Sequence, residues 1–103
     1  MTSGRSPVIS IDIRFNMMGY LYILRTKNNH YYIGSTNNIE RRFFEHISGK
    51  TKSLKHLLPI KIVFSKEYPS IQLARKIEYK LKKLKSRKII DRIVEDQNID
   101  IRL

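Results

Sequence analysis

The stretch YYIGSTNNIERRFFEH, residues 31–46, changes from a strand pattern to a helix pattern along its length. Aromatic and β-branched residues fill its beginning, up to Ser35, as is typical of a strand. Residues 35–38 are polar and can cap a helix, and Asn38 stands directly before it. Three apolar residues then recur at helical spacing until residues 48–49 end the helix: Ile39, Phe43 and Ile47.

A second strand pattern lies just before this stretch. Residues 20–26, YLYILRT, are rich in strand formers, and residues 28–29 favour a turn. The resulting hairpin pairs them with residues 30–35 and brings Tyr22 and Tyr32 near each other. The face that each phenol occupies depends on the register, which the sequence does not determine.

Two polar residues of the predicted helix are candidates for chemistry. Arg42 and His46 are four residues apart, so they share one side of the helix beside its apolar stripe. We expect both side chains to point toward the hairpin. Gly34 and Asn38 are assigned structural roles, because the backbone must bend between the strand and the capped helix.

The second half of the chain predicts a third strand over residues 60–67, a long helix that begins after residues 69–70, and a short helix over residues 86–94. Five residues form the inward stripe of the long helix: Ile71, Ala74, Ile77, Leu81 and Leu84.

Glu78 lies beside this stripe and is the only acid between Glu67 and Asp91. An isolated carboxylate next to a buried stripe is unusual for a merely solvated residue, so we assign it as a candidate metal ligand. The alternative is a weak surface ion pair with Lys82, four residues further on.

The length of 103 residues allows one small domain. We divide the chain into an N-terminal extension over residues 1–18, a domain over residues 19–95 and a tail over residues 96–103. Apolar residues alternate between positions 8 and 15, which predicts one extra strand. The alternative is a leader without fixed structure.

The formal net charge is +12, from twenty-one Lys and Arg against nine Asp and Glu. A small basic domain attracts polyanions, so nucleic acid is the first partner to expect. We predict seven nucleic-acid contacts, three in the connection 49–56 and four near the end of the long helix: Lys50, Lys52 and Lys55, and Lys82, Lys83, Lys85 and Arg87.

The composition disfavours several classes of protein. The sequence has no cysteine, so disulfides and thiolate zinc sites are excluded and any metal must use oxygen or imidazole ligands. It has no apolar run of about 18 residues and no cleavable signal segment, so neither membrane spanning nor secretion is expected. We expect a cytoplasmic protein, associated with the nucleoid if the source is bacterial.

Two phenols, a guanidinium, an imidazole and a carboxylate are the side chains that a one-metal nuclease needs. Each has a simpler explanation when taken singly: the tyrosines as sheet residues, and Arg42 with His46 as a solvated helix pair. The combination indicates a phosphodiester-cleaving site.

At these residues the chain resembles the GIY-YIG endonuclease superfamily, in particular its small single-domain members related to the N-terminal domain of UvrC-like excision-repair nucleases. The resemblance covers about residues 19–94, and the stretch 31–46 is its most specific part. Ala74 to Glu78, followed by LKKLKSRK at residues 81–88, is a second match. The family implies an α+β fold, with a small three-stranded antiparallel sheet flanked by helices, and hydrolysis of DNA.

The resemblance also implies roles for matching residues. Gly34 corresponds to the motif glycine, and Glu78 to the ligand of one Mg²⁺ or Mn²⁺ ion. Water would attack the phosphate after losing a proton to one of the two phenols, and the base is not assigned between them. The implied catalytic residues are Tyr22, Tyr32, Arg42, His46 and Glu78.

The sequence departs from the family pattern at two places. Tyr20 and Leu21 stand where the family name has Gly and Ile, and Leu54 stands in a loop where many relatives have Thr. Neither change removes a catalytic atom. The second predicts a weaker phosphate contact at Leu54.

Three functions follow, in this order: a divalent-metal-dependent endonuclease, a non-catalytic basic nucleic-acid-binding module, and a small basic structural protein such as a ribosome-associated factor. The sequence has no separate recognition module, so low sequence specificity is expected. This favours structure-specific cleavage of DNA in repair or recombination, with RNA as the second candidate substrate. A protein partner or a homodimer would then supply specificity.

Overall fold

Three strands form one antiparallel sheet in the computed structural model, which describes residues 18–99. The central strand is β1 (Gly19–Arg25), and it pairs with β2 (Tyr31–Thr36) on one side and β3 (Lys61–Tyr68) on the other. The predicted hairpin and third strand are confirmed, with small differences at their ends. The extra strand predicted between residues 8 and 15 lies outside the described residues.

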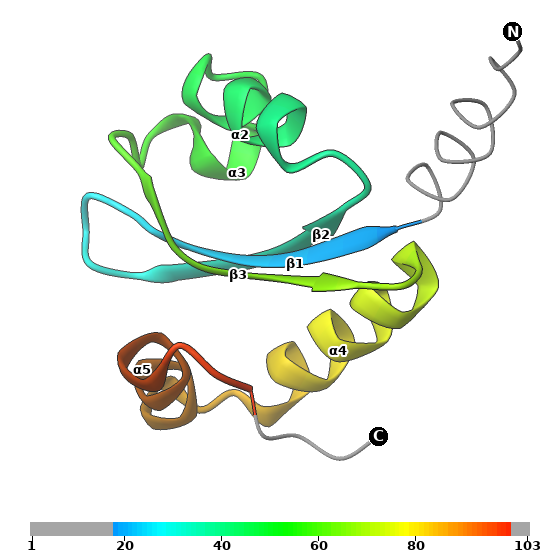
Figure 1. Cartoon of the computed structure of the whole chain (residues 1–103). Coiled ribbons are helices and arrows are strands. Elements are labelled where there is room, and N and C mark those ends of the chain that lie inside the picture. Colours follow the sequence, from blue (N-terminus) through cyan, green and yellow to red (C-terminus); the bar gives the residue numbers. More distant parts are fainter. Residues whose placement is uncertain (1–17, 100–103) are drawn as a thin grey trace, which may run out of the picture.

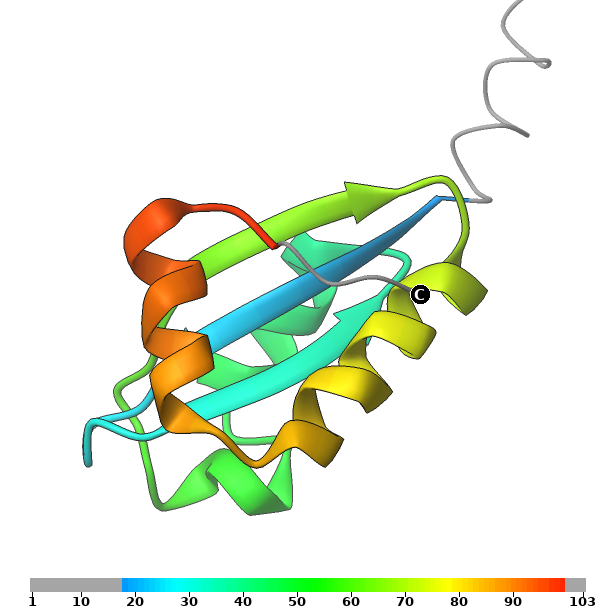
Figure 2. The same ribbon diagram turned by 90° about the horizontal axis from the view of Figure 1, so that it is seen from below.

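Helices cover both faces of this sheet (Figure 1). One face carries α2 (Ile39–Ile47) and α3 (Lys52–Lys55), and the opposite face carries α4 (Ile71–Leu84) and α5 (Arg87–Asp96). Figure 2 shows α4 and α5 on their face of the sheet, with α4 running beside β2. The α+β class and the three-stranded antiparallel sheet are therefore as predicted.

Each face of the sheet has its own apolar core, because successive side chains of a strand point to opposite sides. Leu21 and Ile23 of β1 pack toward α4 and α5, in a cluster that includes Ile77 and Leu81. Tyr22 and Leu24 pack on the other side, with Leu54, Ile60 and part of α2. The alternation along β1 thus directs Tyr22 toward α2 and α3.

Side-chain caps set the beginning of the longer helices, as the polar residues before them predict. Asn38 Oδ1 accepts a hydrogen bond from Arg41 N at 3.0 Å at the start of α2. Ser70 and Ser86 cap α4 and α5 in the same way. Among residues 18–99, no helix is long and apolar enough to cross a membrane.

Three sequence predictions need correction. The connection 49–56 is not irregular throughout, since it contains α3. Leu54 lies on this helix and not in a loop; it is only 1% exposed and belongs to the core, so its side chain is not placed to contact a phosphate. Leu84 is 48% exposed and does not belong to the inward stripe, because α4 ends there and Lys85 (φ 48°) turns the chain away.

Candidate active site

The register of the hairpin places both tyrosines on one face of the sheet. Tyr22 of β1 pairs with Gly34 of β2, and Leu24 pairs with Tyr32, so the two tyrosines are diagonal neighbours. Both pack in the cluster below α2 and α3. The sequence left this register open.

His46 of α2 is completely buried between the two phenols. Its Nε2 atom lies 2.8 Å from Tyr22 Oη, and the ring of Tyr32 meets the imidazole edge-on at a centroid distance of 5.4 Å. Its Nδ1 atom lies 2.7 Å from Thr51 Oγ1, just before α3. Both ring nitrogens therefore have partners, as a buried imidazole requires.

Burial shifts the pKa of both groups toward their neutral forms. It raises the pKa of Tyr22 to about 12, although the nearby Arg42 guanidinium partly opposes the shift. It also lowers the pKa of His46, and the positive charge of Arg42 lowers it further. At pH 7 the pair is a neutral phenol and a neutral imidazole.

Arg42 lies at the rim of this cluster, with 37% of its side chain exposed. Its Nη1 atom donates to Glu45 Oε1 at 2.9 Å, which holds the guanidinium on the α2 surface beside Tyr22. The same contact lowers the pKa of the Glu45 carboxyl. Arg42 is therefore fixed in orientation while it remains open to an incoming anion.

Glu78 approaches from α4, on the opposite face of the sheet, and 20% of its side chain is exposed. Its Oε1 atom accepts a hydrogen bond from Ser35 Oγ, and its Oε2 atom accepts one from Lys82 Nζ at 2.6 Å. The ion pair with Lys82, the alternative to a metal-ligand role, is thus present. Ser35 follows Gly34 in β2 and so points to the other face.

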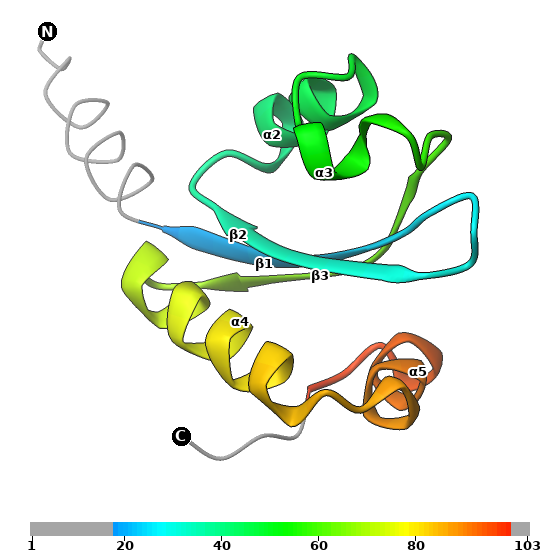
Figure 3. The same cartoon turned by 180° about the vertical axis from the view of Figure 1, so that it is seen from behind.

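These side chains lie around β2, which is an edge strand of the sheet. Figure 3 shows the ribbon of β2 between the α2 side and the α4 side. The tyrosines and His46 lie on the α2 side, and Glu78 lies on the α4 side. The negative charge of Glu78 contributes to the raised pKa of Tyr22, in keeping with their proximity across the strand. Four of the predicted catalytic residues therefore gather on the α2 side of the sheet, and Glu78 reaches the other side of β2 through Ser35.

Residue 34 must be glycine because the ring of Tyr22 packs directly against its backbone. A Cβ atom built at residue 34 would lie 2.3 Å from Tyr22 Oη and 2.4 Å from Tyr22 Cζ, which is far inside van der Waals contact. The ring of Tyr22 therefore lies against the bare backbone of its partner strand. The structural role of Gly34 is therefore to let the ring of Tyr22 approach the backbone of β2 closely.

Gly34→Ala is expected to displace Tyr22 and to lower the free energy of unfolding by about 1–3 kcal/mol, as overpacking does. Thermal unfolding and the NMR signals of His46 measure the two effects. Gly49→Ala is the comparison: there the added Cβ meets nothing within 4 Å, and the cost comes from φ +83° alone. Unchanged His46 signals in Gly34→Ala would contradict this account.

The seven predicted nucleic-acid contacts are all exposed, and they divide between the two sides of the sheet. Lys50, Lys52 and Lys55 lie around α3. On the other side Lys82 is held by Glu78, and Arg87 donates to Asn29 O at 2.7 Å. These two groups lie on opposite faces of the sheet, and their binding role stays a prediction.

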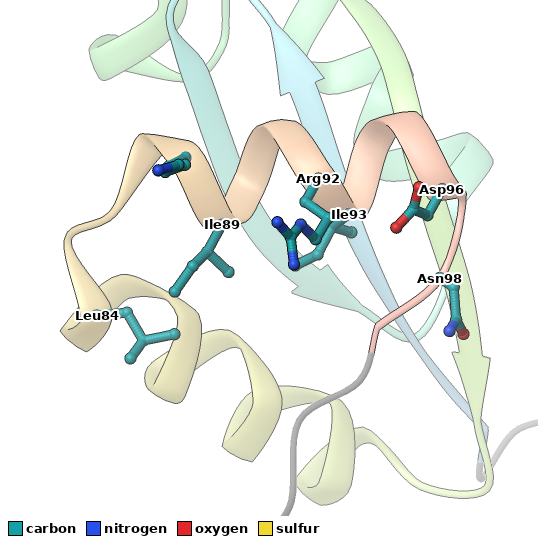
Figure 4. A pocket seen from close by; sticks show the side chains of 7 residues that line it. Leu84, Ile89, Arg92, Ile93, Asp96 and Asn98 are labelled. Carbon is teal, nitrogen blue, oxygen red and sulfur yellow. The ribbon is translucent and has the colours of Figure 1, made fainter.

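A separate hollow of about 670 Å³ lies between the end of α4 and α5 (Figure 4). Leu84, Ile89 and Ile93 form its apolar wall, and Arg92 lies beside them. None of the five predicted catalytic residues lines it. The candidate site is instead built around β2, an edge strand of the sheet.

Three residues in contact with the site were not predicted. Glu45 orients Arg42, Ser35 binds Glu78, and Thr51 binds His46. Strand alternation after Gly34 could have indicated Ser35, since it is the next side chain on the opposite face. No pattern in the sequence indicates Thr51, because its contact depends on how the segment before α3 folds back over α2.

The buried His46 predicts a pH dependence of stability. Its folded pKa lies below the unfolded value of about 6.5, so the unfolded state binds more protons between these two values. This contribution to stability is complete above about pH 6.5 and is lost as the pH falls through the folded pKa. Unfolding temperatures between pH 7.5 and 5 should drop more steeply in the parent than in His46→Gln. Equal pH dependence of the unfolding temperature in the two proteins would contradict the lowered pKa of His46.

Comparisons with known proteins agree with this geometry. A family model described as the GIY-YIG catalytic domain matches residues 18–90. A UPF0213 protein of Photorhabdus laumondii is 43% identical over 65 residues, which cover 62% of this chain and 62% of that protein. The UPF0213 protein YhbQ of Escherichia coli (strain K12) is 39% identical over 69 residues, or 66% of this chain and 69% of YhbQ.

A solved structure is also similar. The solution NMR structure of a UPF0213 protein from Bacillus halodurans matches with a TM-score of 0.53 and 34% sequence identity, over 79% of this chain and 86% of that chain. The chain thus spans about two thirds of the length of the two curated relatives, and more of the solved one.

Proposed function

The chain belongs to the GIY-YIG catalytic domain family, and on that premise we propose that it is an endonuclease that hydrolyses DNA phosphodiester bonds with the help of a divalent cation. The observation that carries this proposal is the meeting of five side chains around one edge strand: Tyr22, Tyr32, Arg42, His46 and Glu78. A protein that only binds nucleic acid has no use for a buried phenol–imidazole pair beside an arginine.

Arg42 is proposed to hold the phosphate. Its guanidinium can donate two parallel hydrogen bonds to phosphate oxygens, and its charge opposes the negative charge that increases as water attacks. Glu45 already fixes one side of the guanidinium, so the Arg42 side chain loses little conformational freedom when the substrate binds.

Tyr22 is proposed to take the proton of the attacking water. Because the pKa of Tyr22 is raised to about 12, its side chain is almost entirely protonated at pH 7. Tyr22 must therefore lose its own proton as it accepts the proton of the water. His46 Nε2, 2.8 Å from Tyr22 Oη, is the acceptor, and its lowered pKa keeps it neutral and able to accept. The rings of Tyr32 and His46 form a T-shaped pair, with no hydrogen bond between them among the described residues, so Tyr22 is the better placed of the two phenols.

The residues around Glu78 fit a single divalent cation. The Lys82 ammonium, 2.6 Å from Oε2, already places a positive charge beside the carboxylate, while Ser35 fixes the other oxygen. No group of three or more His, Cys, Asp or Glu that could form a closed metal cage occurs within residues 18–99. One carboxylate with water and phosphate oxygens is an environment that Mg²⁺ or Mn²⁺ accepts. When bound, the ion would neutralise phosphate charge and assist the leaving oxygen.

We further propose that the substrate is recognised by its shape, as in a flap, nick or damaged duplex in repair or recombination. The two basic groups on opposite faces of the sheet support this, since lysines contact phosphates without reading the bases. A protein partner or a second copy of the chain could add specificity.

The proposal is tested with labelled single-stranded, duplex, nicked and flap DNA, together with matched RNA, in Mg²⁺, Mn²⁺ or chelator. Cleavage that requires the metal and favours one DNA shape is the expected result. Salt-sensitive binding without cleavage of any substrate would overturn the nuclease proposal and favour the binding module instead.

A further inference from the structure

We propose that Thr51 is a positioning residue of this site: its hydroxyl fixes the tautomer of His46 so that Nε2 accepts the hydrogen bond of Tyr22. The effect on cleavage rests on the proposed function, whereas the tautomer itself does not. Thr51 is the N-cap residue at the start of α3.

The geometry is a chain of three side chains. Tyr22 Oη lies 2.8 Å from His46 Nε2, and His46 Nδ1 lies 2.7 Å from Thr51 Oγ1. A neutral imidazole has one N–H donor and one acceptor nitrogen, and each hydroxyl can donate or accept. Two arrangements are therefore open, and they run in opposite directions along the same chain.

Burial distinguishes the two directions. If Thr51 donated to Nδ1, then Nε2–H would donate to Tyr22 Oη, and the phenolic hydrogen would need another acceptor. In the resting protein, before substrate and the attacking water bind, Tyr22 is only 3% exposed, Arg42 beside it can only donate, and within residues 18–99 no other acceptor is bonded to Tyr22 Oη. In the opposite direction the remaining hydrogen belongs to Thr51, which is only partly buried and can reach water.

An unsatisfied buried hydroxyl costs more than an exposed one. The chain therefore runs from Tyr22 O–H to Nε2, and from Nδ1–H to Thr51 Oγ1. This direction leaves the lone pair of Nε2 facing the phenol. When Tyr22 accepts a proton from water, its own proton can move to Nε2, and the Nδ1–H bond to Thr51 persists in the resulting imidazolium.

The opposite tautomer would present an N–H group to Tyr22 and could not receive its proton. Thr51 is the hydroxyl that selects between the two, so it acts on the reaction only through His46. The contact is not part of the local helix structure, since Thr51 precedes α3 without a side-chain capping bond. Its removal therefore need not disrupt the helix.

The tautomer is measured directly in ¹⁵N-labelled protein, from two-bond proton–nitrogen correlations of the imidazole rings. The chain has three histidines, and the exposed His30 and His56 serve as internal references. In the parent, Nδ1 of His46 should carry the proton. In Thr51→Val the Nδ1–H group loses its acceptor, so the signal should change to the Nε2–H form. An unprotonated Nδ1 in the parent would overturn the proposal.

Kinetics supply the second readout. Thr51→Val should lower kcat by roughly tenfold with little change in KM, because the substituted atom supports a proton transfer and not DNA binding. Thr51→Ser should keep both the tautomer and the rate. The matched control is Ser53→Ala, which removes an exposed hydroxyl from the same helix.

The outcomes separate the two proposals. If the parent cleaves no substrate, the nuclease proposal fails, and the NMR measurement still decides the tautomer. If Thr51→Val keeps the parental kcat, or if Ser53→Ala loses as much as Thr51→Val, the positioning role is overturned. Should Thr51→Val fail to fold, Thr51→Ala and the parental spectrum decide the question by the same criteria.

Discussion

Replacement of Glu78 by Gln is expected to lower the cleavage rate on the order of 10³-fold while DNA binding is kept, since a bound divalent cation typically contributes several kcal/mol to the transition state. Gln keeps the shape of the side chain and can still bond to Ser35. It lacks the negative charge that a divalent cation requires, so the loss measures the charge and not the packing.

The measurement is the single-turnover rate of cleavage in Mg²⁺, with DNA binding followed by fluorescence anisotropy in chelator. Binding should be unchanged or slightly tighter, because Glu78→Gln removes a negative charge and releases Lys82 from its ion pair. Glu67→Gln is the matched control, since it removes the same charge from an exposed position on β3. Parental cleavage by Glu78→Gln would show that another group holds the metal, or that none is needed.

Much of this fold could be predicted from the sequence because its signals are local. Asn38, Ser70 and Ser86 each stand directly before a helix and cap it, which is a relation between residues three apart. The strands follow from runs of β-branched and aromatic residues, and the turn at residues 28–29 joins two of them. Local rules fail where burial depends on the whole fold, as at Leu54 and Leu84.

The candidate site depends both on local sequence signals and on contacts that only the whole fold determines. The spacing of Arg42 and His46 follows from the helix, whereas the facing of the tyrosines depends on a register that local patterns do not specify. The partners of the catalytic groups are more distant still: Ser35 meets Glu78 from 43 positions away, across the sheet edge. Residue types therefore indicated the chemistry, and only the three-dimensional structure shows what orients it.

Replacement of Arg42 by Lys is the second variant for which a large effect is expected, a loss of about 10²-fold in kcat, as for removal of one transition-state donor. Lysine keeps the positive charge but is a point donor on a flexible chain. Its ammonium lacks the planar fork that donates two parallel hydrogen bonds to phosphate oxygens, so the phosphate would be bound without a fixed orientation.

The adjacent residue provides the control, because Arg41 is also an arginine of α2 that faces Glu45. Its Nε atom lies 3.9 Å from Glu45 Oε2, and 57% of its side chain is exposed. Arg41→Lys should cleave within about twofold of the parent, since an exposed ion pair contributes little. Both variants keep the net charge, so the salt dependence of DNA binding should be the same in both.

A lower kcat in Arg42→Lys than in Arg41→Lys, with equal DNA binding, would show that the two-pronged guanidinium of Arg42 contacts the reacting phosphate. Equal losses in both variants would instead mean that α2 contributes only positive charge, as a binding surface does. Parental activity in Arg42→Lys would remove the phosphate role altogether. The pair of variants thus separates charge from geometry at two neighbouring positions of one helix, where the fold is otherwise unchanged.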